Sequence, residues 1–257
     1  MIDIHTHILP DLDDGPADMD TSVGMGLIAA AEGFTAIIST SHSEQAAIEG
    51  HERLSMRLDD VRDAWSKAGL NIRLELGMEI FLRPNTLDQL KAGHLWALAG
   101  SRYLLVELPL QPWPTYADDT LYGLQLAGYV PVLAHPERYT AIQSDPGKMY
   151  ELAERGILGQ VTAAAVIGEH GTSIKKCSEM LLRHNLVQFI ATDAHSTGRR
   201  HPRIAEARAY AETMVGPELA ADMVQGNPAR ILAHEAISLD PQPVAPRKSF
   251  FGSLFSR

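Results

Sequence analysis

Residues 1–15 read MIDIHTHILPDLDDG, and this stretch gives the strongest indication of the fold. Ile2 and Ile4 alternate with polar residues, which is the pattern of a β-strand with a buried face. His5 and His7 come at the end of that strand and are two residues apart, so both side chains point to the same side. The stretch therefore predicts a strand with a pair of metal-capable side chains at its carboxyl end.

Strands and helices are predicted to alternate along the whole chain. The predicted strands are residues 1–5, 34–41, 72–78, 103–107, 129–134, 157–162 and 187–192. The predicted helices are residues 18–32, 51–69, 86–92, 116–127, 145–155, 171–185, 202–214 and 217–235. This alternation favours a parallel α/β sheet, open or closed. A chain of 257 residues with 45% hydrophobic content has the right size for a single α/β barrel.

Histidines and acidic residues follow six of the seven predicted strands. The candidate metal ligands are His5, His7, Asp14, His42, Glu79, Glu107, His135, Asp193 and His195. Parallel strands would bring these side chains together at the carboxyl-terminal rim, where barrel enzymes have their active sites. Imidazole nitrogen and carboxylate oxygen suit zinc, manganese or iron, and the set contains no thiolate. One such residue alone would indicate little, but the whole set is large enough for more than one ion.

The composition excludes several classes of protein. The formal net charge of −10 argues against non-specific binding to nucleic acid, so we expect no nucleic-acid partner. Cys177 is the single cysteine, which rules out an intramolecular disulfide. No apolar run reaches the length that spans a membrane, and residues 1–15 do not resemble a signal sequence. We therefore expect a cytoplasmic protein.

Six short motifs occur in the order that is typical of a known family. They are DIHTH (3–7), STSH (39–42), GMEI (77–80), VELP (106–109), AHPERY (134–139) and TDAH (192–195). With them, the chain resembles the polymerase and histidinol phosphatase (PHP) superfamily of metallohydrolases. Within that superfamily it is most similar to the bacterial manganese-dependent protein-tyrosine phosphatases of capsule and exopolysaccharide loci. The resemblance covers about residues 1–235.

The resemblance implies a distorted seven-stranded (β/α) barrel at residues 1–237 that holds three divalent metal ions. Manganese is the first expectation, with iron, zinc or cobalt as alternatives. The implied ligands of the first ion are His5, His7, Glu79 and Asp193. Those of the second are Glu79, which bridges, with Glu107 and His135. Those of the third are Asp14, His42 and His195.

The resemblance also implies two arginines that bind the substrate phosphate. By motif these are Arg138 in AHPERY and Arg200 in HSTGRRHP, and both are expected to be catalytic. Arg199 is adjacent to Arg200, and the match does not decide which of the two contacts phosphate. Arginine suits this role because its planar guanidinium binds phosphate through two parallel hydrogen bonds. Relatives often carry asparagine or serine where this chain reads QVTAAAVIG (160–168), which leaves the preferred phosphoprotein open.

The implied activity is metal-dependent hydrolysis of phosphotyrosine in a protein. The expected substrate is a membrane-associated bacterial tyrosine kinase that regulates capsular or exopolysaccharide synthesis. The nearest alternative is a small-molecule phosphatase, such as one that acts on histidinol phosphate. A metal-dependent nuclease is disfavoured by the acidic charge, and a binding protein without activity is disfavoured by the complete set of ligands. The sequence does not indicate the oligomeric state.

Cys177 and Arg183 in KCSEMLLR (176–183) have the spacing of cysteine-dependent tyrosine phosphatases. That chemistry needs a loop of backbone amides around the anion and a thiol with a low pKa. The segment contains no glycine and reads as the middle of a helix, with Ile174, Cys177 and Leu181 on one face. We therefore predict a core cysteine and a mechanism that does not depend on it.

The segment 238–257, SLDPQPVAPRKSFFGSLFSR, differs in composition from the rest of the chain. Its three prolines indicate the end of the folded domain, and its last residues combine phenylalanine with basic residues. Such a tail could contact a membrane surface or a partner, or could pack on the domain. Among the remaining histidines, His170 is expected at the surface, and the sequence leaves the position of His201 open.

Overall fold

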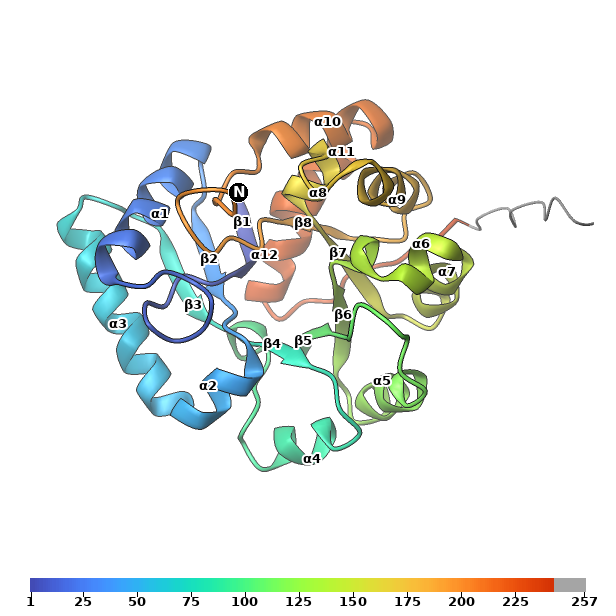
Figure 1. Ribbon diagram of the computed structural model, residues 1–257, viewed down its shortest axis with the longest axis horizontal. Helices are drawn as coiled ribbons and strands as arrows, with labels where there is room; N and C mark the ends of the chain where they lie inside the picture. The colour runs from blue at the N-terminus through green and yellow to red at the C-terminus, as the bar shows by residue number, and fades with distance from the viewer. Residues whose placement is uncertain (243–257) are drawn as a thin grey trace, which may run out of the picture.

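The first strand, β1 (Ile2–Thr6), forms where the alternating isoleucines predict it. It belongs to a ring of parallel strands that is surrounded by helices in the computed structural model, which describes residues 1–242 (Figure 1). The other strands are β2 (Ala36–Ser39), β3 (Arg73–Leu76), β4 (Glu79–Phe81), β5 (Tyr103–Glu107), β6 (Val130–Ala134), β7 (Leu158–Thr162) and β8 (Phe189–Ala191). The predicted alternation of strand and helix is confirmed.

Backbone hydrogen bonds close the strands into a barrel. Hydrogen-bonded pairing divides the strands into the sheets β1-β2-β3 and β4-β5-β6-β7-β8. One junction is closed where His7 N donates to Ala194 O (2.8 Å) and Asp193 N donates to His5 O (2.8 Å). At the other junction Glu79 N lies 3.3 Å from Thr40 O. Both junctions therefore lie beside predicted metal ligands.

The third predicted strand, residues 72–78, is divided in the structure. It ends as β3 at Leu76, and the chain re-enters the barrel as β4, which begins with Glu79. A side chain at Gly77 would lie 2.8 Å from Ile38 Cγ2 and 2.9 Å from Leu98 Cδ2, so only glycine fits at this bend. If β3 and β4 are counted as one bent strand, the barrel has the seven strands that the resemblance implies. The division makes Glu79 the first residue of a strand, where the sequence predicted that it follows one.

The long predicted helices are present, with ends that differ by a few residues. They are α1 (Met19–Glu32), α3 (His51–Lys67), α4 (Thr86–Lys91), α5 (Ala117–Leu126), α7 (Gly147–Glu154), α9 (Thr172–Arg183) and α10 (Ala205–Val215). The predicted helix 217–235 is divided into α11 (Pro217–Ala221), the π-helical turn η3 (Asp222–Gly226) and α12 (Asn227–Leu232). The sequence missed the helices α2 (Ser43–Glu49), α6 (Thr140–Ser144) and α8 (Ala163–Ile167) and the 3₁₀ turns η1 (Leu98–Gly100) and η2 (Pro136–Arg138). Each missed element has seven residues or fewer, and in such short segments a helical period shows only weakly.

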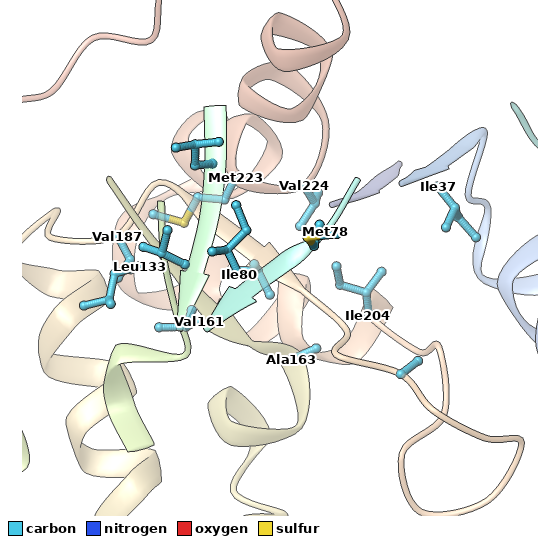
Figure 2. Packing of buried hydrophobic residues seen from close by; sticks show 14 of the residues in the cluster. Ile37, Met78, Ile80, Leu133, Val161, Ala163, Val187, Ile204, Met223 and Val224 are labelled. Carbon is cyan, nitrogen blue, oxygen red and sulfur yellow. The ribbon is translucent and has the colours of Figure 1, made fainter. Parts of the chain in front are cut away.

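Two hydrophobic clusters hold the barrel and its helices together. In the larger cluster the strand residues Ile80, Leu133 and Val161 pack with Met223 and Val224 of η3 (Figure 2). The smaller cluster joins residues of six strands to Ile231 of α12. The helix α12 crosses the middle of the ring in Figure 1. These apolar side chains fill the barrel.

Residues 237–242 continue along the folded domain past the predicted boundary at Ser238. Ile237 and Leu239 pack against the smaller cluster, and Gln242 N donates to His184 O (2.7 Å). The rest of the predicted tail, residues 243–257, lies outside the described residues. Among residues 1–242, none of the helices has both the length and the apolar composition needed to cross a membrane.

Candidate metal centre

All of the predicted metal ligands come together at the carboxyl ends of the strands. Their donor atoms fall into overlapping groups, and within each group these atoms lie within 4.8 Å of one another. The groups are His7, Asp14, His42 and His195; His5, His7 and Asp193; His5, Glu79 and His135; and His42, Glu79 and Glu107. Six loops or strand ends that are far apart in the sequence thus contribute to one compact centre.

Glu79 lies at the middle of this centre. Its Oε2 atom is 3.2 Å from His5 Nε2 and 3.4 Å from His7 Nε2. The same atom is 3.0 Å from His42 Nδ1. The other oxygen, Oε1, is 3.0 Å from His135 Nε2. A carboxylate whose two oxygens face different sets of nitrogens has the arrangement of a ligand that bridges two ions.

Asp14, His42 and His195 form a second focus beside Glu79. Asp14 Oδ1 is 3.0 Å from His195 Nε2 and 3.2 Å from His42 Nε2. The imidazole rings of His195 and His7 stack with 3.7 Å between their centroids. His42 therefore lies between the two foci, with Nδ1 towards Glu79 and Nε2 towards Asp14.

Several of these donor atoms are buried but make no hydrogen bond among the described residues. They are the Nε2 atoms of His5, His7 and His195 and the Oε2 atom of Glu79. His5 Nε2 and Glu79 Oε2 are only 3.2 Å apart, yet their orientation does not form a hydrogen bond. A buried polar atom without a partner costs about 1–3 kcal/mol. Divalent cations would satisfy these converging lone pairs, so the residues fit a metal centre.

Outer hydrogen bonds fix the histidines in the orientation that ligation needs. His5 Nδ1 lies 2.8 Å from Gln160 Oε1, and His7 Nδ1 lies 2.7 Å from Asp13 Oδ2. Because each Nδ1–H donates to an oxygen, Nε2 is the nitrogen of each neutral ring that is left to bind a cation at the centre. The sequence predicted no ligand after the sixth strand and did not single out Gln160. Its only signal was an amide side chain within a buried strand.

The backbone is strained at two of the predicted ligands. His135 has φ 37° and Asp193 has φ 52°, in the left-handed region that side chains other than glycine rarely occupy. Such a conformation costs of the order of 1–3 kcal/mol and persists only where the surrounding structure enforces it. Here the strain turns each side chain away from the direction of its strand and into the centre.

The arginines take different positions. Arg200 Nη1 is 2.9 Å from Asp14 Oδ2, and its Nη2 is 2.9 Å from Asp193 Oδ1. Arg138 Nη1 is 3.4 Å from Asp193 Oδ2. Arg199, by contrast, is exposed and has no ion pair within residues 1–242. The backbone carbonyl of Arg200 accepts from His195 N (2.8 Å), and this bond turns Arg200 back towards the ligands.

A groove of about 1160 Å³ leads to the centre and reaches Arg138 and Asp193. Arg199 and Arg200 line one part of it, together with His170 and His201. His170 was predicted only to be a surface residue, and no motif had linked it to the site. The groove therefore has a basic side, although the chain as a whole is acidic.

Carboxylates around His5 and His42 oppose the deprotonation of these two imidazoles. Burial lowers the pKa of His5, but the charges of Glu79 and Asp193 outweigh this and raise it to about 9. Burial also lowers the pKa of His42, while its close contacts with the carboxylates of Glu107 and Glu79 raise it to about 11. In the metal-free protein both imidazoles are therefore protonated at neutral pH.

This protonation predicts that metal binding depends on pH. A metal ion binds neutral imidazole, so loading at pH 7 must release protons. The apparent affinity therefore rises as pH increases through about 9, the pKa of His5, and on towards about 11, the pKa of His42. Calorimetric titration of Mn²⁺ into the metal-free chain, in buffers of different ionisation enthalpy, measures the number released. We expect at least one proton per chain, and an enthalpy that is independent of the buffer would contradict the prediction.

The alternative cysteine site is absent from the described part of the chain. Cys177 is buried within α9, and Arg183 is the last residue of the same helix. The intervening residues are helical, so their backbone amides are directed along the helix and form no loop around an anion. The prediction that Cys177 is a core residue is confirmed.

The fold and the centre together define a class of protein. A closed barrel of parallel strands, with histidines and carboxylates gathered at the carboxyl ends, is the arrangement of metal-dependent hydrolases of the (β/α)-barrel type. The chain belongs to the CpsB/CapC family, because a family model described as "Capsular polysaccharide synthesis, CpsB/CapC" matches residues 1–233.

Known relatives agree with this assignment. The tyrosine-protein phosphatase YwqE of Bacillus subtilis is 36% identical over 97% of this chain and 99% of its own. The tyrosine-protein phosphatase CpsB of Streptococcus pneumoniae is 28% identical over 92% of this chain and 100% of its own. A crystal structure from work on these two "unique metal-dependent tyrosine phosphatases" superposes with a TM-score of 0.91, at 34% identity, over 96% of this chain and all of the other. The predicted resemblance and fold class are confirmed.

A more distant likeness shows the fold alone. A β-aspartyl dipeptidase from Fervidobacterium islandicum has a TM-score of 0.50 at 12% identity, over 90% of this chain and 72% of its own. Because a shared fold does not imply a shared function, the substrate of this chain has to be inferred from its own site.

Proposed function

We propose that this chain is a metal-dependent phosphomonoesterase that hydrolyses phosphotyrosine in proteins. The observation that carries the proposal is the convergence of buried His and carboxylate donors on Glu79, beside two arginines at the end of a groove. The two relatives above are named tyrosine-protein phosphatases, which supports the choice of substrate.

The proposed ligand sets follow the three-ion arrangement that the sequence resemblance implies. The first ion would be held by His5, His7, Glu79 and Asp193; the second by Glu79, Glu107 and His135; and the third by Asp14, His42 and His195. Nitrogen and oxygen donors without thiolate suit Mn²⁺, with Fe²⁺, Zn²⁺ or Co²⁺ as alternatives. Three divalent ions against four carboxylates would leave the centre positive, as a phosphate dianion requires.

When bound, divalent ions supply Lewis acidity that activates water and neutralises charge on the phosphate. The residues of the chain then hold the substrate. Arg138 and Arg200 present guanidinium groups on the Asp193 side of the centre, where they would donate hydrogen bonds to the phosphate oxygens. These bonds orient the phosphoryl group and stabilise the charge that it carries in the transition state.

We further propose that the substrate is a membrane-associated bacterial tyrosine kinase that controls capsular or exopolysaccharide synthesis, and that the enzyme acts in the cytoplasm. The family description names capsular polysaccharide synthesis, which supports this choice. The basic and aromatic tail at residues 238–257 offers a peripheral contact with the membrane or with the kinase. Deletion of residues 243–257 should weaken that association; unchanged association would exclude a role of the tail.

Side-by-side turnover of two substrates tests the proposed activity. The metal-loaded enzyme is given a phosphotyrosine peptide and histidinol phosphate at matched concentrations. We expect a higher kcat/KM on the peptide. A clear preference for histidinol phosphate would instead favour the small-molecule phosphatase, and turnover of the peptide by the metal-free chain would contradict the metal-dependent reaction.

Cys177→Ser should leave this activity nearly unchanged. The thiol is buried in α9 and is not among the residues that line the groove, so its loss removes no group that meets the substrate. Steady-state kinetics on the phosphotyrosine peptide, with thermal unfolding as a check of the fold, measure the effect. We expect kcat/KM within about twofold of the wild type, because the folded variant keeps every residue that lines the groove. Placing a hydroxyl in the core costs about 1–3 kcal/mol of stability, which the thermal unfolding measures. A large loss of kcat in a folded variant would favour cysteine chemistry.

A further inference from the structure

The groove beside the metal centre is lined by aliphatic as well as charged side chains. Leu110 and Ile174 are the aliphatic side chains that line it, and the same groove reaches Arg138 and Asp193. The apolar surface and the proposed phosphate position are thus parts of one continuous cavity. Neither residue belongs to a motif that the family resemblance used.

Leu110 is unusual because it is a large apolar side chain that is 44% exposed. It lies in the segment 108–116, directly after the predicted ligand Glu107. The backbone there is held in place: Thr140 N donates to Leu110 O (3.3 Å), and Leu108 N donates to the Tyr139 hydroxyl (3.0 Å). An exposed leucine on a segment that is fixed in this way presents a ready-formed apolar surface to the groove.

Ile174 reaches the groove from another direction. It lies in the first turn of α9, and α9 packs against η2, the turn that carries Arg138. The hydrogen bonds of residues 108 and 110 go to Tyr139 and Thr140, which directly follow the same turn. Both residues are therefore positioned relative to the turn that carries Arg138: Ile174 through the packing of α9, and Leu110 through hydrogen bonds to the residues that follow the turn.

We propose that Leu110 and Ile174 form the subsite for the phosphotyrosyl ring and give the enzyme its preference for aryl over alkyl phosphates. The proposal deepens the proposed function and rests on it. A phosphate bound near Arg138 carries its ester group into the groove, where a phenyl ring removes apolar surface of both side chains from water. A phosphoserine or a short alkyl phosphate has no group that reaches these side chains, so it gains little from them.

Binding of two phosphonates tests the subsite without turnover. Phenylphosphonate and methylphosphonate share the anionic head and differ in the ring, and both are titrated into the metal-loaded protein. The double variant Leu110→Ala/Ile174→Ala should bind phenylphosphonate about tenfold more weakly, since truncating two aliphatic contacts loses roughly the energy of two buried methylene groups. Its affinity for methylphosphonate should stay within about twofold of the wild type.

Leu126→Ala is the matched control. Leu126 is also an exposed leucine, at 71%, but it lies on α5 and does not line the groove. It should change neither affinity. Leu110→Ala alone is measured as well, because truncating this exposed side chain leaves no internal cavity, and it should show a smaller loss in the same direction.

The outcomes separate the subsite from the proposed activity. Loss of phenylphosphonate binding alone, with kcat/KM on the phosphotyrosine peptide reduced to a similar degree, supports the subsite. Suppose that the wild type hydrolyses the peptide, but Leu110→Ala and the double variant bind the two phosphonates as the wild type does, or bind both of them more weakly by the same factor. The subsite is then wrong and the proposed activity stands. If the wild type does not hydrolyse the peptide, it is the proposed activity that fails.

Discussion

Glu79→Gln is expected to reduce phosphatase activity by at least about 1,000-fold, because removing even a single donor to transition-state charge costs about 10²–10³ in kcat. Glu79 Oε2 faces the nitrogens of His5 and His42 at 3.2 and 3.0 Å, and Oε1 faces His135 at 3.0 Å. Glutamine keeps the shape but offers one neutral oxygen and an NH₂ group, which cannot bind a cation. The variant should therefore lose metal as well as activity, and Mn²⁺ should not restore it.

The measurement is metal content per chain together with kcat/KM on a phosphotyrosine peptide. The wild type after chelation provides the reference, and its activity should return when Mn²⁺ is added. Glu75→Gln is the matched control, because Glu75 lies in the neighbouring strand β3 and pairs with Arg73 at 2.7 Å, outside all of the donor groups. A folded Glu79→Gln chain with full metal content and more than a tenth of the wild-type activity would show that Glu79 is not the bridging ligand.

The position of the candidate centre could be predicted from the sequence because its metal-capable residues directly follow short apolar segments that read as strands. His5, Glu107 and His135 each lie at the end of an apolar, strand-like segment, and parallel strands must bring their ends to one rim. The alternation of strands and helices predicted a parallel sheet, open or closed, and the family resemblance implied the barrel. An error of two residues in a strand boundary does not move such a residue to the other end of the barrel.

The features that the sequence did not reveal depend on contacts between distant segments. Gln160 is separated from His5 by 155 residues, and only their 2.8 Å contact distinguishes it from any other buried amide. The division between β3 and β4 depends on the close approach of Ile38 and Leu98 to Gly77. Leu110 likewise reads as an ordinary loop residue until its hydrogen bond with Thr140, 30 residues away, places it at the groove.

The choice between Arg199 and Arg200 was also open in the sequence, because adjacent residues share one motif. Their positions in the structure differ because of the turn at residues 196–200. His195 N and Ser196 N both donate to Arg200 O (2.8 and 3.0 Å), which returns the chain to the centre at Arg200. Arg199 also lines the groove, but it has no ion pair with a ligand among the described residues. The guanidinium of Arg200 then reaches Asp14 and Asp193, each at 2.9 Å.

We therefore expect Arg200→Lys to lower kcat/KM by about 100-fold, because lysine cannot replace a guanidinium that donates two directed hydrogen bonds to transition-state charge. Arg199→Lys preserves the net charge in the same way and is the matched control. It should change kcat/KM by about threefold or less, as expected for an exposed charge without a fixed partner.

The affinity for methylphosphonate, measured with metal content, separates two roles of Arg200. If Arg200 binds the phosphate, Arg200→Lys weakens methylphosphonate binding while the metal content stays complete. If Arg200 only holds Asp14 and Asp193 in place, the variant loses metal, and binding recovers when Mn²⁺ is added in excess. Equal losses of kcat/KM in Arg199→Lys and Arg200→Lys would contradict the assignment of Arg200, and not Arg199, as the arginine that binds the phosphate.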